Sequence, residues 1–137
     1  MVATATKDKI VEELGVLSDK ISTVVRTTAI GLLAVGWGFI VAPSERFRLH
    51  PAAVLAIIVC ALLGLMLDWL QYLAGYVNTY SRFRQMERDP NLRGWDPSDW
   101  SYGLRDALWK AKQLIVALGV VILVASAVPS IIHFLVQ

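Results

Sequence analysis

Three long stretches of the sequence contain no Asp, Glu, Lys or Arg, and this segregation of charge limits the folds open to the chain. They are Thr27–Ser44, Leu49–Leu67 and Gln113–Gln137. A helix rises about 1.5 Å per residue, so about 20 apolar residues cross a hydrocarbon core of about 30 Å. Apolar residues occur on all sides of each stretch, as expected for lipid contact, and the mean hydropathy of the chain is +0.57. We therefore predict an all-α integral membrane protein with three long transmembrane helices.

The chain has 137 residues, which is enough for a single membrane domain. The segments expected within it are a cytosolic amphipathic helix at 7–25, membrane spans at 26–43, 51–77 and 113–136, and a cytosolic helical hairpin at 78–112. Pro43 and Asp89-Pro90 are expected to end the first two helices, and Pro97 suits the first turn of the third. Apolar stripes in the segments outside the bilayer predict that the projecting helices pack as a small bundle.

Lys and Arg are distributed unequally between the two sides of the membrane. Of the 13 Lys and Arg residues, all except Arg46 and Arg48 lie ahead of the first apolar stretch or between the second and third. These two regions share one side of a three-span protein, and cationic loops favour the cytosolic side. We therefore predict that the N-terminus is in the cytosol and the C-terminus outside. The compact loops favour a bacterial inner membrane.

Asp68 is the one acidic residue inside the apolar segments. A charge at the centre of a membrane helix costs roughly 2.5–3.5 kcal/mol, so Asp68 needs a partner, water or a proton. Counted from Pro51, it lies about 25 Å along its helix, a depth that Arg26 and Lys112 also reach. One interpretation is an ion pair that holds the three helices together. The other is a ring of Asp68 side chains that attracts cations to the mouth of an oligomeric pore.

Small residues and a polar face mark the spans as candidates for helix packing and for a pore lining. The small residues are Gly31, Ala34 and Gly38 in the first span, and Ala52, Ala56, Cys60 and Gly64 in the second. Such spacing lets two helix backbones approach closely in lipid, either within one chain or between subunits. Ser126, Ser130 and His133 share one face of the third span. Serine hydroxyls in lipid commonly bond to their own helix, and the alternative is that this face lines a pore.

Signatures of catalysis and of metal binding are missing from the sequence. It has two histidines and one cysteine, and it contains no Cys-x-x-Cys, no His-Glu-x-x-His and no Gly-rich phosphate loop. We expect no enzyme activity, no cofactor, no metal and no nucleic-acid partner. Trp95, Trp100 and Tyr102, with nearby arginines, instead form a cytosolic face suited to a soluble protein or to anionic lipid headgroups.

Two functions are compatible with these features. The first is a small homo-oligomeric membrane protein that forms an ion-conducting or membrane-permeabilising assembly. A single three-helix unit is too thin to enclose a channel, so this function requires several subunits. The second is a membrane-anchored interaction module that recruits a cytosolic partner through its inner face while the spans hold it in the lipid bilayer.

Overall fold

Three long helices make up the described part of the computed structural model, which covers residues 2–42, 49–89 and 100–136. The helices are α1 (Val2–Val41), α2 (Pro51–Arg88) and α3 (Trp100–Val136). Segments long and apolar enough to cross a membrane are found in each of them, at Gly15–Val41, Pro51–Arg88 and Tyr102–Pro129. The prediction of an all-α chain with three long helices of this kind is confirmed.

Local chemistry explains both ends of α2. His50 precedes the helix in an extended conformation, and its Nδ1 accepts a hydrogen bond from the Ala52 amide at 3.3 Å. Pro51 then occupies the first turn, where its missing N–H costs nothing. At the other end Asp89 is extended, as expected before a proline. The prediction that Asp89-Pro90 ends the second helix therefore agrees with the observed end of α2 at Arg88.

The ends of α1 and α3 are less fully described. α1 ends at Val41, whereas Pro43 and Pro97, predicted to end the first helix and open the third, lie outside the described residues. α3 passes through Pro129 and continues to Val136. That proline therefore removes one backbone hydrogen bond without ending the helix.

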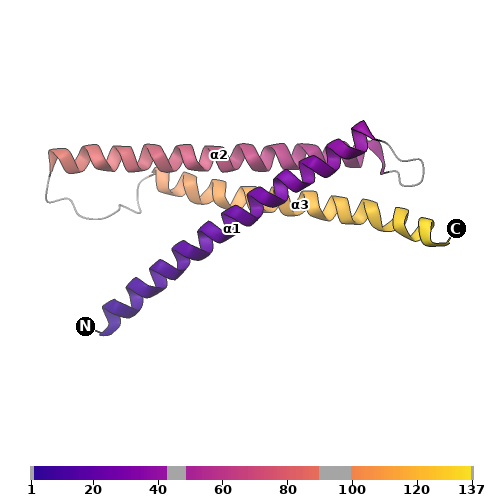
Figure 1. Ribbon diagram of the computed structural model, residues 1–137. Helices are drawn as coiled ribbons and strands as arrows, with labels where there is room; N and C mark the ends of the chain where they lie inside the picture. The colour runs from indigo at the N-terminus through magenta and orange to yellow at the C-terminus, as the bar shows by residue number, and fades with distance from the viewer. Residues whose placement is uncertain (1, 43–48, 90–99, 137) are drawn as a thin grey trace.

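The helices do not run parallel along their whole length (Figure 1). α2 and α3 lie side by side along the middle of α2, whose last turns extend past the start of α3, while α1 crosses this pair obliquely and its N-terminal part diverges from both. Long helices that pack at an inclined angle touch at the crossing point and separate on either side of it. In the described residues α1 therefore separates from the other two helices on one side of the crossing, and the bundle of all three projecting helices stays a prediction.

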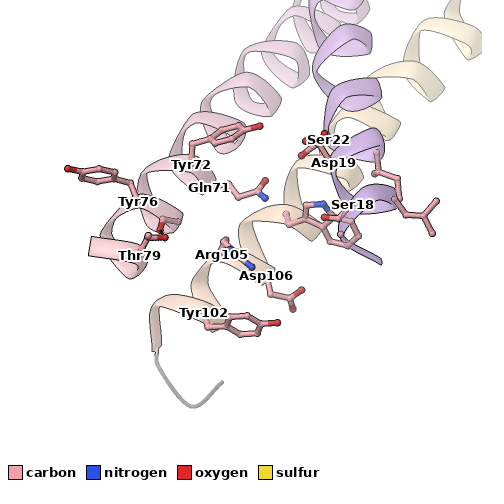
Figure 2. Close-up of a pocket in the computed structure, with 15 residues that line it drawn as sticks. Ser18, Asp19, Ser22, Gln71, Tyr72, Tyr76, Thr79, Tyr102, Arg105 and Asp106 are labelled. Atoms are coloured by element: carbon pink, nitrogen blue, oxygen red, sulfur yellow. Dashed lines mark hydrogen bonds between the residues drawn. The ribbon is translucent and has the colours of Figure 1, made fainter. Parts of the chain in front are cut away.

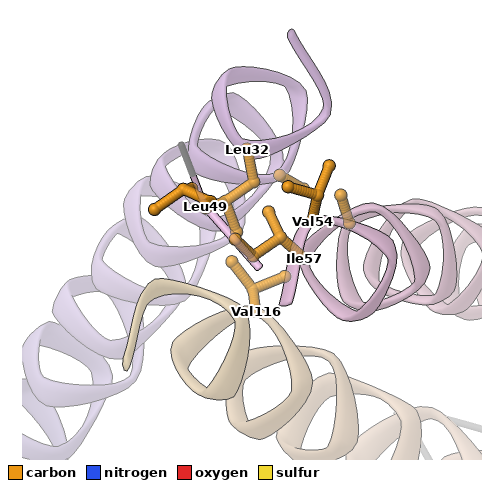
Figure 3. Close-up of a cluster of buried hydrophobic side chains, with 7 residues drawn as sticks. Leu32, Leu49, Val54, Ile57 and Val116 are labelled. Atoms are coloured by element: carbon orange, nitrogen blue, oxygen red, sulfur yellow. The ribbon is translucent and has the colours of Figure 1, made fainter. Parts of the chain in front are cut away.

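A small apolar core lies at the helix crossing (Figure 3). Its buried members come from all three helices and from Leu49, two residues before α2: Ala29, Leu32, Leu49, Val54, Ile57, Ala61 and Val116. Most other apolar side chains face outward; Leu114, for example, is 72% exposed. At most 33% of the residues in the most apolar window of any helix are buried. Lipid contact accounts for this uncovered apolar surface.

Candidate functional site

A buried charge cluster joins the three helices beside the apolar core. The Asp68 carboxylate of α2 accepts from Lys112 Nζ of α3 at 2.5 Å through Oδ1, and from Arg26 Nε of α1 at 2.8 Å through Oδ2. Lys112 Nζ also donates to Ser22 Oγ of α1 at 2.5 Å. The structure thus brings together the three residues that the sequence places at one depth. We call Arg26, Asp68 and Lys112 the charge triad.

Burial differs sharply among the members of the charge triad. The side chain of Lys112 is 0% exposed and that of Asp68 is 8% exposed, whereas the side chain of Arg26 is 40% exposed. Two cations face one anion, so the triad carries one excess positive charge. The exposed Arg26 guanidinium can reach the membrane interface, where a charge costs far less than in the hydrocarbon core. The Lys112 side chain is fully buried and does not reach the interface, so its ammonium group is stabilised by its contacts with Asp68 and Ser22.

Two further residues complete the cluster, and sequence reasoning did not assign either of them to it. Ser22 precedes Arg26 by four residues, and Tyr72 follows Asp68 by four, so each shares a helix face with its neighbour. Arg26 Nη2 donates to Tyr72 Oη at 2.8 Å, and the guanidinium lies over the tyrosine ring at 5.2 Å. Polar residues one turn from an intramembrane charge are the signal that could have identified them.

Glycines on two helices allow the close approach that the triad requires. A Cβ added to Gly64 of α2 would collide with the Val116 side chain of α3. A Cβ on Gly119 of α3 would lie 2.9 Å from Leu32 Cδ1 and 3.0 Å from Cys60 Cβ. Cys60 and Gly64 therefore lie at a helix contact inside the chain. Gly119 makes a comparable contact, but the small-residue pattern did not single it out.

The other small residues predicted to pack are more exposed within one chain. Gly31, Ala34, Gly38 and Ala52 are exposed, and Ala56 is partly buried. A Cβ added to Gly31 or Gly38 would meet nothing within 4 Å. The α1 glycine in contact with α2 is Gly36, where an added Cβ would lie 2.6 Å from Ile58 Cγ1. The exposed face of α1 is thus open to lipid or to another protein surface.

The candidate pore-lining face of α3 is described only in part. Ser126 Oγ donates to the Ile122 carbonyl of its own helix at 2.7 Å, the bond that serine commonly forms in apolar surroundings. The side chains of Ser130 and His133 lie outside the described part of the structure.

A cleft of about 920 Å³ opens next to the triad, where α1 diverges from α2 and α3. Figure 2 shows the Gln71 side chain directed from α2 into this space, with Arg105 and Asp106 on α3 and Asp19 on α1 around it. Among the described residues, Gln71 Oε1 and Trp109 Nε1 are buried polar atoms without a hydrogen-bond partner, and both residues line the cleft. The lining thus includes two residues that each carry a buried polar atom without a partner, an acceptor on Gln71 and a donor on Trp109.

Beyond the triad, α2 and α3 continue as a projection that we call the stalk, residues 72–88 and 100–111, in which the end of α2 extends past the start of α3. Trp100, at the start of α3, is 73% exposed, and Tyr102 is 42% exposed. Arg105 lies over the Tyr102 ring at 5.4 Å, and Arg84 lies over the Tyr80 ring at the same distance. Trp95, predicted to belong to the same face, lies outside the described residues.

In the described ranges, no three His, Cys, Asp or Glu residues are grouped so that they could hold a metal ion. The architecture and the three candidate spans define the class of the molecule, a multi-pass membrane protein. Comparisons with protein-family models, curated proteins and solved structures return no match. Its function must therefore be inferred from the chemistry of the charge triad, the cleft and the stalk.

Proposed function

We propose that this chain is a membrane-anchored interaction module that recruits a cytosolic protein through its stalk, with the N-terminus of the chain in the cytosol. The observation that carries the proposal is the length of the projecting helices. α2 has 38 residues, whereas about 20 suffice to cross the hydrocarbon core. The remaining residues of α2 extend well beyond the bilayer, and the start of α3 packs against the part of them nearest the membrane.

The surface chemistry of the stalk supports recruitment of a protein. Tyr76 is 67% exposed and Phe83 is 59% exposed, although neither would lie at hydrocarbon depth. Exposed aromatic side chains next to arginines are typical of the residues that dominate protein interfaces. Because these groups are carried on helices, little backbone conformational entropy is lost on binding. In this proposal the spans are the anchor, and the charge triad holds α1 against the stalk helices.

The test compares two exposed tryptophans. Three full-length chains are crosslinked in cells and purified in mild detergent. They are the wild type, Trp100→Ala in the stalk, and Trp37→Ala in the span of α1. Trp37 is 61% exposed, so the control removes a ring of similar exposure from a part that faces lipid. We expect one soluble protein to copurify with the wild type and with Trp37→Ala, and to be lost with Trp100→Ala. Equal recovery with all three chains would refute the proposal.

A homo-oligomeric, ion-conducting assembly is the second candidate, favoured by the open face of α1. The exposed Gly31 and Gly38 leave room for a second helix to approach closely. We rank this candidate lower because both carboxylate oxygens of Asp68 are bound by cations of the same chain. A pore lined by a ring of free Asp68 carboxylates would require the ion pairs of Asp68 with Lys112 and Arg26 to be broken in every subunit.

Mass and conductance separate the two candidates. Native mass measurement in nanodiscs should give one copy of the chain if the spans serve only as an anchor. Several copies, together with ion currents in planar bilayers, would establish the conducting assembly instead.

A further inference from the structure

We infer that the cleft between α1, α2 and α3 binds the zwitterionic headgroup of a phospholipid with a primary ammonium group, as in phosphatidylethanolamine. The cleft shares Tyr76, Tyr102 and Arg105 with the stalk, but the inference does not require a protein partner.

The position of the cleft suits a lipid headgroup. Gln71 and Tyr72 line it one helical turn after Asp68 on α2, about 30 Å along the helix from Pro51. That distance equals the thickness of the hydrocarbon core, so the cleft lies where headgroups begin. Its volume of about 920 Å³ is within the usual range for small-molecule sites. A lipid whose chains lie against the apolar faces of the helices can place its headgroup there without leaving the bilayer.

The unsatisfied atoms indicate what the ligand must supply. Gln71 Oε1 is an acceptor and needs a donor, whereas Trp109 Nε1 is a donor and needs an acceptor. An ammonium group supplies N–H donors, and a phosphate supplies acceptor oxygens. A trimethylammonium headgroup has no N–H and would leave the Gln71 oxygen unpaired, which is costly for a buried polar atom.

The charges that line the cleft favour a headgroup with no net charge. Arg105 supplies one cation, and Asp19 and Asp106 supply two acids. Asp106 is already paired with Lys110 at 2.7 Å, which leaves Arg105 and Asp19 on opposite walls, on α3 and α1 (Figure 2). A phosphate facing Arg105 and an ammonium facing Asp19 match this pair.

Native mass spectrometry of the full chain in mild detergent tests the site directly. The chain is titrated separately with phosphatidylethanolamine, phosphatidylcholine and phosphatidylglycerol of identical acyl chains. We expect phosphatidylethanolamine to bind about fivefold more tightly than either of the others, the factor that one net hydrogen bond provides. Equal affinities, or a preference for phosphatidylglycerol, would overturn the inference. This comparison uses the wild-type chain, so it does not depend on the folding of any variant.

Matched variants then locate the site. Gln71→Leu should remove the preference for phosphatidylethanolamine, while Gln85→Leu, on the same helix and away from the cleft, should keep it. Arg105→Gln should weaken binding of all three phospholipids, because each carries a phosphate. Arg84→Gln is its control, since Arg84 also lies over a tyrosine ring but outside the cleft. Cleft variants that bind the three lipids as the wild type does would refute the assignment.

Discussion

The charge triad makes a quantitative prediction for Asp68→Asn. Each of its two ion pairs, with N–O distances of 2.5 and 2.8 Å, contributes a direct attraction of about 6 kcal/mol at an effective dielectric constant of about 20. Much of this attraction is offset by desolvation, so removing one partner of a buried pair costs about 3–5 kcal/mol. Asparagine retains the shape of Asp68 but leaves Lys112 and Arg26 as two unneutralised cations. The expected loss lies at the upper end of that range because Lys112 is fully buried.

The assay is reversible unfolding in mixed micelles, with increasing sodium dodecyl sulfate and tryptophan fluorescence as the signal. Lys112→Met should cost less, about 0–2 kcal/mol, because Asp68 then keeps Arg26 and no buried cation is left alone. The double variant should be more stable than the sum of the two single losses predicts, since its unpaired charge is the partly exposed Arg26. Glu87→Gln, at an exposed position, is the control. Additive losses, or a loss below about 1 kcal/mol for Asp68→Asn, would show that the triad does not hold the helices.

Three further perturbations test other features of the structure. Gly64→Ala should lower the free energy of unfolding in the same assay by about 1–3 kcal/mol, because the added methyl group meets the Val116 side chain. Gly31→Ala, whose methyl group meets no atom, should leave the free energy of unfolding unchanged or raise it by up to about 1 kcal/mol. Equal effects of the two substitutions would contradict the packing at Gly64. Asp106→Asn should change stability by no more than about 0.5 kcal/mol, since its pair with Lys110 is solvent-exposed; a larger loss would mean that the pair is buried in an assembly. A fluorescent protein fused to the N-terminus should fold in the cytosol and alkaline phosphatase fused to the C-terminus should be active outside it, whereas the reverse pattern would reject the proposed orientation.

Helix number and extent could be predicted from the sequence because they depend on local chemistry. Charge-free stretches of sufficient length occur three times, and Pro51 and the Asp89-Pro90 pair mark the start and end of α2. The depth of Arg26, Asp68 and Lys112 could also be estimated, because helical rise converts residue number into distance. These inferences require no knowledge of how one helix is turned toward another.

Tertiary structure alone decided which faces of the helices meet. Apolar residues surround each span, so periodicity does not distinguish a side that contacts lipid from a side that contacts protein. The participation of Ser22 and Tyr72 in the charge cluster, the contact at Gly119 and the exposure of Gly31 and Gly38 all depend on helix rotation. The oblique crossing of α1 also opens the cleft beside Gln71 and Trp109. Crossing angle and rotation arise from side chains that interdigitate across helices distant in sequence, and no local pattern of residues specifies them.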